Sequence, residues 1–221
     1  MKTTLIQKPR LLALLGLVMT LSACGETVND SDKDNVSLPV IAAKIGDTWD
    51  EVIQNSTFKL GPTPSPAGTI INQPHTFVYR DQHHRMQLDN VGYTGVALQY
   101  FTHHVLGFGI GVYRESAGVD ETWERLQDII QKMEMAGWIP DDESNNSNPS
   151  AKSAAELRSQ YLNLPGGARG GEKFWYDEYG NEAWVSLVKT ITGRNPGEEP
   201  RFNVVLQIQV ATNPKKLKAA P

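Results

Sequence analysis

The chain has 221 residues, in which 21 lysines and arginines stand against 25 aspartates and glutamates, for a formal net charge of −4 at pH 7. Nucleic-acid binding depends on clustered lysine and arginine, so this balance argues against a nucleic-acid partner. Cys24 is the single cysteine, which excludes an internal disulfide and leaves stability to a packed core.

The first 23 residues predict a secretory signal peptide. Lys2, Lys8 and Arg10 precede an apolar run at 11–23 that is too short to span a bilayer comfortably. No later apolar run in the sequence approaches spanning length. Removal of residues 1–23 would leave 18 basic and 25 acidic residues, a formal charge of −7, which makes a nucleic-acid partner still less plausible.

The signal ends in Leu21-Ser22-Ala23-Cys24, which resembles the lipobox of bacterial lipoproteins. The resemblance implies cleavage before Cys24, diacylation of its thiol and acylation of the freed amine. Several acyl chains would make the anchor stable, because a single chain binds a membrane only marginally. Gly25, where aspartate favours inner-membrane retention, implies the outer membrane and a body facing the periplasm. A buried structural cysteine is the alternative interpretation of Cys24.

Two polar stretches predict the domain organisation. Residues 24–44 are interpreted as a flexible tether, because they begin with an acidic segment that lacks periodicity. Fully extended, about 15 such residues reach roughly 50 Å. A second polar stretch at 140–152 is interpreted as a linker between an N-terminal half, 45–139, and a C-terminal half, 153–214, with a tail at 215–221.

The N-terminal half begins with a predicted short helix at 46–56, capped by Asp47 or Thr48. Its inward-facing residues are expected to be Trp49, Val52 and Ile53. Short β-type runs follow at 75–80, 85–91, 95–101 and 104–115. Turn residues separate these runs, so we expect an up-and-down meander of four strands.

The clearest helix in the sequence lies at 119–137. Its apolar residues, spaced by four, three, four and three positions, are Val119, Trp123, Leu126, Ile130 and Met133. That spacing is typical of an amphipathic helix with one buried face. Asp120 suits the first turn, and Gly137 is the expected C-terminal stop.

In the C-terminal half we expect a helix at 151–164, a hairpin at 172–191 and a strand at 201–210. The strand prediction rests on strict alternation of apolar and polar residues, which buries one face. The predicted fold class is therefore α+β, with antiparallel sheet packed against helices. Each half reads as a helix followed by strands, which hints at two pseudo-duplicated halves.

Gly107, Gly109 and Gly111 raise the question of a phosphate-binding loop. A dinucleotide fingerprint requires G-x-G-x-x-G at the start of a helix, whereas the spacing here is G-x-G-x-G. On a strand, residues two apart share a face, so the three glycines leave one face bare. We expect the helix at 119–137 to cover that face, and Gly109→Val to destabilise the fold.

Histidines offer the main alternative chemistry. His83, His84, His103 and His104 lie in the first and third turns of the expected meander, which meet at one end of a sheet about 10 Å apart. A zinc or copper site bridging the two turns is possible in principle. Solvated turn histidines are the favoured interpretation, since neither carboxylates nor cysteines recur at ligand spacing. We expect no metal and no cofactor beyond the lipid on Cys24.

Aromatic residues are concentrated in the predicted hairpin. They are Phe174, Trp175, Tyr176, Tyr179 and Trp184. Core packing is the favoured explanation, and a partner-binding patch is the functional one. If the patch exists, either Trp175 or the pair Phe174 and Tyr176 points away from the core. Trp175→Ala is expected to weaken capture of the partner, and the fold should survive this change if Trp175 is the outward residue.

Catalytic signatures are absent from the sequence. It contains no G-x-S-x-G, no H-E-x-x-H and no Walker loop. The carboxylates Asp47, Asp50 and Glu51 suit a helix N-terminus without any catalytic purpose. We therefore expect no enzymatic activity, with a hydrolase that uses the histidine turns as the alternative.

Two resemblances concern the role of the protein. The stretch 44–64, with its glycine-threonine turn, short helix and Gly61-Pro62 step, resembles the opening of BamE/SmpA-like envelope lipoproteins. The plan of a lipid anchor, acidic tether and α+β body resembles immunity lipoproteins of type VI secretion systems. Both imply a periplasmic protein partner. The expected function is binding and inhibition of a secreted effector, and the alternative is a scaffold in outer-membrane assembly.

Overall fold

The computed structural model describes residues 37–62, 68–147, 150–162, 164–190 and 199–210. Within these ranges, residues 171–172 are described by their backbone alone. The described residues from Ser37 to Val210 belong to one compact unit. The predicted signal peptide, the lipobox, most of the tether and the tail lie outside the described residues. In the part of the chain that is described, no helix combines the length and hydrophobicity that crossing a lipid bilayer requires.

The fold is α+β, as the sequence predicts. Its helices are α1 (Trp49–Asn55), α2 (Val119–Met135), α3 (Asp142–Ser147) and α4 (Ala154–Tyr161). Its strands are β1 (Val40–Ala42), β2 (Gly68–Ile71), β3 (His75–Arg80), β4 (Arg85–Val91), β5 (Tyr93–Leu98), β6 (Val105–Gly111), β7 (Ile139–Pro140), β8 (Arg169–Tyr176), β9 (Glu182–Lys189) and β10 (Phe202–Gln209).

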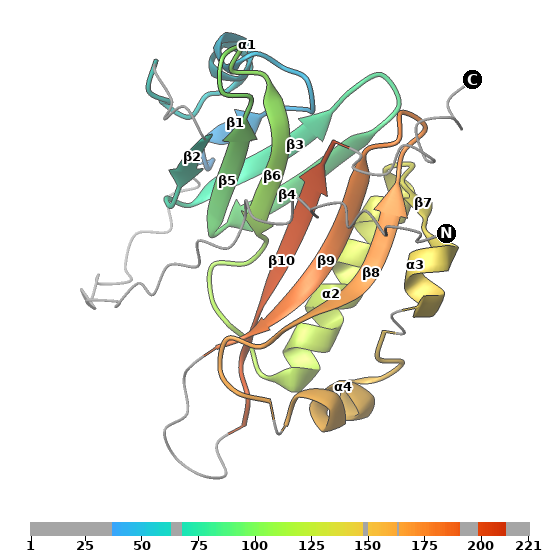
Figure 1. The fold of residues 1–221 in the computed structure, drawn as a ribbon. Helices are drawn as coiled ribbons and strands as arrows, with labels where there is room; N and C mark the ends of the chain where they lie inside the picture. Colours follow the sequence, from blue (N-terminus) through green and yellow to red (C-terminus); the bar gives the residue numbers. More distant parts are fainter. Residues whose placement is uncertain (1–36, 63–67, 148–149, 163, 191–198, 211–221) are drawn as a thin grey trace, which may run out of the picture. The chain divides into compact units, whose positions relative to one another are not determined.

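The strands form two sheets (Figure 1). The larger is antiparallel throughout, in the order β2-β5-β6-β10-β9-β8-β7. The smaller has the order β1-β3-β4, with β1 parallel to β3. The four strands expected as one meander are thus divided, because β3 and β4 leave the sheet that β5 and β6 join.

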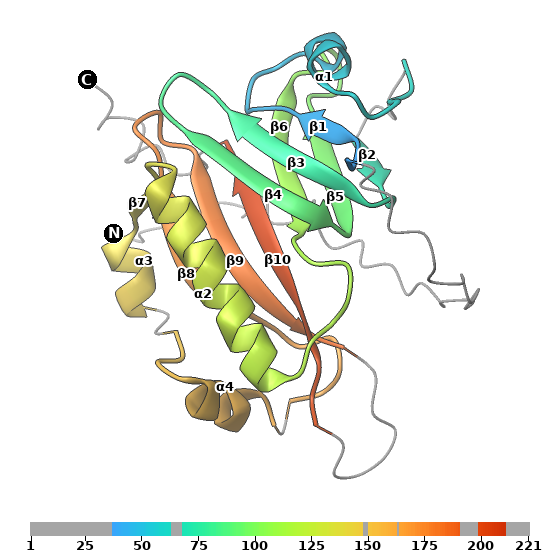
Figure 2. The same ribbon diagram turned by 180° about the vertical axis from the view of Figure 1, so that it is seen from behind.

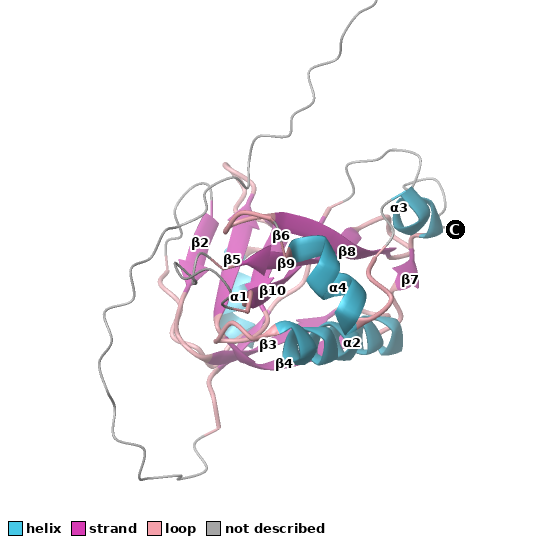
Figure 3. Cartoon of the chain, turned by 90° about the horizontal axis from the view of Figure 1, so that it is seen from below, coloured by secondary structure: helices cyan, strands magenta, loops and turns pink. Residues whose placement is uncertain are grey.

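One face of the large sheet carries the core. Helix α2 lies along β8–β10, and the small sheet lies beside α2 over β5 and β6 (Figure 2). Seen from below in Figure 3, α2, β3 and β4 form one layer and the large sheet the other. Phe77 of β3 meets Phe108 of β6 edge to face, with ring centroids 5.2 Å apart. Trp175, Phe202 and Leu126 are also fully buried between the layers.

Local sequence signals explain α1 and α2 well. Thr48 caps α1 in a capping box with Glu51, since each side chain binds the other residue's backbone N–H. Gly137 follows α2 with φ of +93°, the left-handed conformation that ends helices. The buried stripe of α2 is Val119, Thr122, Leu126, Ile129 and Met133. Trp123 and Ile130, expected in the stripe, are only partly buried at its edge.

The domain boundaries expected from composition need correction. Strand β1 lies within the predicted tether, and its residue Ile41 is fully buried because β1 pairs with β3. Helix α3 lies within the predicted linker at 140–152, where Asn145 binds the backbone of Phe174 through both its side-chain atoms. The two expected halves share the large sheet, with β6 paired directly to β10. Polar composition therefore did not mark an interdomain boundary here.

The glycine strand faces a different neighbour from the one expected. The small sheet, not α2, lies over β6: Phe108 packs against Phe77 and Tyr79 of β3, on the face opposite the three glycines. A side chain added at Gly109 would meet no heavy atom within 4 Å. The expected contact between α2 and Gly109 is wrong, because α2 lies along β8–β10 and the small sheet packs against the bulky side chains of β6, which bury more apolar surface.

Candidate functional site

Two hairpin turns meet at one end of the molecule. The β3–β4 turn carries Asp81, His83 and His84, and the β8–β9 turn carries Asp177 and Glu178. Both turns lie at the same end of the fold in Figures 1 and 2. His83 and His84 lie 3.3 Å from the two oxygens of the Glu178 carboxylate, so the turns are in direct contact.

Asp81 organises the first turn. Its Oδ1 accepts hydrogen bonds from the backbone N–H groups of His83 and His84, at 2.8 and 2.7 Å. Both carboxylate oxygens also lie 3.0–3.1 Å from His84 Nδ1. Burial alone would raise the pKa of Asp81, but these hydrogen bonds outweigh it and hold the pKa below its usual range.

His84 is buried between the two turns, with 2% of its surface exposed. Its Nδ1 faces Asp81, and its Nε2 lies 3.3 Å from Glu178 Oε2. The ring also packs against Trp138, with centroids 5.3 Å apart. His84 therefore has fixed ring nitrogens, each directed at a carboxylate of a different hairpin.

Asp177 organises the second turn. It is 1% exposed and accepts hydrogen bonds from the backbone N–H groups of Tyr179 and Asn181 and from the Asn181 side chain. Burial raises the pKa of Asp177, although the Asn181 and Tyr179 hydrogen bonds and nearby His84 act in the opposite direction. Hydrogen bonds therefore fix the position of the Asp177 carboxylate, but they do not fully offset the effect of burial on its pKa.

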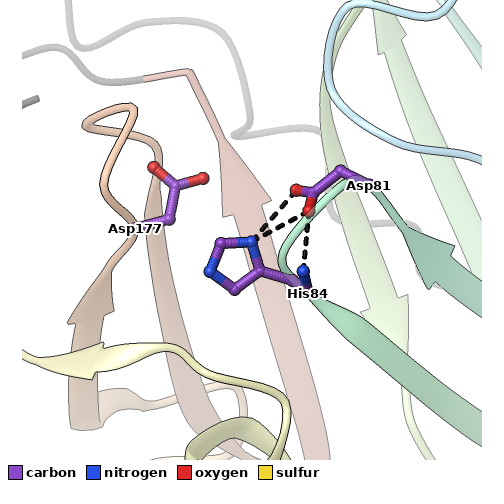
Figure 4. A group of neighbouring side chains, drawn as sticks. All are labelled: Asp81, His84 and Asp177. Atoms are coloured by element: carbon purple, nitrogen blue, oxygen red, sulfur yellow. Dashed lines mark hydrogen bonds and ion pairs between the residues drawn. The ribbon is translucent and has the colours of Figure 1, made fainter. Parts of the chain in front are cut away.

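These side chains form a cluster of metal-ligand type. One potential ligand atom from each of Asp81, His84 and Asp177 lies within 4.8 Å of the others. Figure 4 shows the imidazole between the carboxyl groups, with Asp81 and His84 from one turn and Asp177 from the other. A single imidazole with two carboxylates can bind a divalent metal ion or a proton.

An open hollow of about 580 Å³ adjoins the cluster. Its lining residues are Lys44, Ile45, Tyr79, Arg80, Asp81, Gln82, Tyr179 and Asn181. Burial raises the pKa of Tyr79, and the carboxylates of Asp81 and Asp177 act in the same direction, so the phenol stays protonated. Lys44 is ion-paired with Asp47 at 2.8 Å. The hollow gives solvent and small ions access to Asp81.

The alternative of a metal site bridging the two histidine pairs is not formed, and the favoured interpretation of solvated turn histidines is wrong for His84, which is buried. His103 and His104 belong to the β5–β6 connection, which adjoins α1: the Trp49 backbone N–H donates to His103 O at 3.1 Å, and Thr48 forms a β-bridge with His104. Since β4 and β5 belong to different sheets, the turns are not at one edge of a common meander. His84 instead meets carboxylates from the C-terminal hairpin.

The aromatic hairpin divides between core and surface. Trp175 is 1% exposed beneath the α2 layer, so it is the inward residue, and its assignment as a candidate partner-binding residue is wrong. Phe174, Tyr176 and Trp184 are partly buried on the opposite face of the sheet. Phe174 is paired directly with Trp184 across the strands, and Tyr179 in the turn is 43% exposed. The alternation was predicted correctly, and the structure decides that Trp175 points inward while Phe174 and Tyr176 lie on the other face.

The sequence did not identify Asp81, Asp177 and Glu178 as partners of the histidines. A local signal for Asp81 exists, since an aspartate two residues before a histidine pair suits an Asx turn. Asp177 and Glu178 lie nearly 100 residues away, and proximity over that distance depends on the packing of two hairpins. Cys24, the predicted lipidation site, lies outside the described residues.

No protein-family model matches this chain, and comparisons with curated proteins and with solved structures likewise find no match.

Proposed function

We propose that this chain is a lipid-anchored periplasmic protein without catalytic activity, which binds a secreted effector protein and neutralises it. The lipid on Cys24 would hold it at the outer membrane. Binding would use the face of the large sheet opposite α2, at the C-terminal hairpin. The proposal joins the lipobox-like N-terminus with the distribution of aromatic side chains in the fold.

The observation that carries the binding site is the partly exposed aromatic group of Phe174, Tyr176 and Trp184. All three lie on the sheet face away from α2, and Phe174 is the cross-strand neighbour of Trp184. Aromatic side chains with an accessible face are the commonest anchors of protein interfaces. Rigid strands hold these anchors in place, which lowers the entropic cost of binding.

Polar residues continue this surface toward the middle of the sheet. Trp184 is paired with the partly buried Gln207, and Gln207 is paired with Gly109, a buried glycine at which an added Cβ would meet no heavy atom within 4 Å. Glu182 and Gln209 form the next cross-strand pair. An aromatic cluster beside a flat polar strip suits a protein surface better than a small molecule, and the expected charge of −7 favours a basic partner.

The test is a quantitative pull-down of periplasmic proteins with the full, lipidated chain in detergent. Trp184→Ala and Phe174→Ala should each weaken capture of the partner at least roughly thirtyfold, because interface aromatics typically contribute more than 2 kcal/mol. Phe101→Ala is the matched control, since Phe101 is 89% exposed in the β5–β6 connection. Circular dichroism checks that each variant is folded.

The identity of the captured protein decides the role. A secreted toxic effector, against which co-expression of the chain protects cells, supports the proposal. A component of outer-membrane assembly would replace it by a scaffolding function. Equal capture by wild type, Trp184→Ala and Phe174→Ala would place the interface elsewhere and contradict the proposed site.

A further inference from the structure

We propose that Asp81, His84 and Asp177 bind one divalent transition-metal ion, with Zn²⁺ as the best-matched ion, where the β3–β4 and β8–β9 turns meet. The site differs from the aromatic surface in its residues and in its chemistry. It also differs from the alternative weighed from the sequence, a bridge made of histidines alone; the favoured expectation there was that no metal binds.

The geometry is close to that of a coordination sphere. Zinc binds nitrogen and oxygen at roughly 2.0–2.2 Å, so the ligand atoms of a tetrahedral site lie roughly 3.3 Å apart. His84 Nδ1 and the Asp81 carboxylate oxygens are already separated by 3.0–3.1 Å. All three ligand atoms lie within 4.8 Å of one another, so small side-chain rotations would bring Asp177 into range.

The residues around the cluster support the ligands as they do in metal sites. A metal-bound histidine usually donates its second ring N–H to a carboxylate, and ligating carboxylates are themselves hydrogen-bonded. His84 presents Nδ1 to Asp81 and Nε2 to Glu178, which assigns metal binding to the first nitrogen and the supporting contact to the second. Backbone N–H groups fix both Asp81 and Asp177.

The charge balance favours a cation. With a neutral imidazole, Asp81, Asp177 and Glu178 together carry three formal negative charges around His84. Lys44, which lines the adjacent hollow, is ion-paired with Asp47 instead. A divalent ion would offset most of this charge, and the hollow beside Asp81 gives it a route of entry.

The donor set selects the class of ion. An imidazole nitrogen suits zinc and its neighbours, whereas calcium and magnesium prefer sites made of oxygen alone. Three protein ligands leave a fourth coordination position on zinc, which a water molecule would occupy. The proposal concerns metal binding alone and does not depend on the proposed protein partner.

The experiment is isothermal titration of the full chain in detergent with zinc chloride, after treatment with EDTA. One equivalent of zinc should bind, and zinc should raise the melting temperature because it binds the folded state. Cobalt(II) serves as a spectroscopic probe, since its visible absorption reports coordination by nitrogen and oxygen. Calcium chloride at the same concentration should give no comparable heat.

Three variants locate the site. Loss of a group that supports a metal ligand typically weakens metal binding roughly 10- to 100-fold, and we expect Glu178→Gln to weaken zinc binding by a factor in that range. His84→Gln and Asp177→Asn should weaken zinc binding by a larger factor, because they remove ligands. Asn at position 177 retains an oxygen to accept the Tyr179 and Asn181 backbone hydrogen bonds, so the turn should still form. The control is His103→Gln combined with His104→Gln, which should leave binding unchanged.

Absence of zinc binding by the folded wild type would overturn the proposal, and the cluster would then be an ion-paired clamp between the hairpins. Unchanged binding in folded Asp177→Asn and His84→Gln would overturn it as well, because the ion would then be held elsewhere. Neither result would affect capture of a protein partner, so failure of this proposal is distinguishable from failure of the proposed function.

Discussion

His75 is a buried histidine that the structure holds in one neutral form. Its Nδ1 lies 2.7 Å from the Gln73 carbonyl oxygen, which can only accept, so Nδ1 carries the proton. Its Nε2 then accepts from the Thr94 hydroxyl at 2.8 Å. The side chain is 0% exposed, and burial lowers its pKa despite the bond to Gln73.

The lowered pKa of His75 predicts a pH dependence of stability. The unfolded chain takes up a proton near pH 6.5, whereas the folded chain resists protonation to a lower pH. The stabilisation by neutral His75 is therefore fully present above about pH 6.5 and is lost as pH falls through the folded-state pKa. We expect His75→Gln to be less stable than wild type at pH 7.5, with the difference shrinking toward pH 5. Urea denaturation across this range measures it, and parallel curves would contradict the assignment.

Two glycines of β6 are expected to respond oppositely to the same substitution. A Cβ at Gly107 would lie 2.8 Å from the Ile208 carbonyl oxygen, a backbone atom that cannot easily move, whereas one at Gly109 meets nothing within 4 Å. Gly107→Ala should lower the free energy of unfolding by about 1–3 kcal/mol. Gly109→Ala should leave it unchanged or raise it by up to about 1 kcal/mol, because alanine restricts the unfolded chain. Equal effects in urea denaturation would show that the strand is packed differently.

At the scale of elements, the β8–β9 hairpin combines structural and surface roles on its two faces. Trp175 fills the core beneath α2, while Phe174 and Tyr176 lie on the other face of the same strand. The indole Nε1 of Trp175 is buried without a hydrogen-bond partner among the described residues. The ring thus stabilises the fold through its apolar area and loses some of that gain through the unpaired N–H.

Truncation of the hairpin tryptophans should separate these roles. Trp175→Ala should lower the free energy of unfolding by about 3–5 kcal/mol, since it leaves a large cavity. Trp175→Phe should cost clearly less, because it also removes the unpaired N–H. Trp184→Ala, on the accessible face, should be the mildest of the three. Chemical denaturation ranks them, and a larger loss for Trp184→Ala would reverse our assignment of the two faces.

Local sequence signals explain many elements but few of the contacts between them. The capping residue Thr48, the stop at Gly137 and the alternation in β10 were all readable, because each depends on neighbours within a few residues. Strands β1 and β2 were missed. Both are short, β1 lies in the predicted tether and β2 follows a proline-rich stretch, and pairing with β3 and β5 decides their conformation.

At the scale of the whole molecule, attachment to the membrane is predicted to depend on one residue. Cys24→Ala should abolish labelling with radioactive palmitate and leave the chain uncleaved or released from the membrane, because Cys24 is the sole residue predicted to carry lipid. Fractionation of cells that express each form measures the distribution. Palmitate on the Cys24→Ala chain would refute the lipobox interpretation, and an unchanged circular dichroism spectrum would show that the anchor and the fold are independent.

The sequence by itself determined the α+β class, the amphipathic helix α2 and the turn of the β8–β9 hairpin, and it carries the prediction of a lipid anchor. These features follow from periodicity, capping and turn chemistry within short windows. Only the tertiary structure decided that β3 and β4 form a separate sheet, that Trp175 rather than Phe174 points inward, and that Asp177 lies beside His84. Alternation defines two faces of a strand without saying which is buried, and strand partners distant in sequence are chosen by the packing of the whole core.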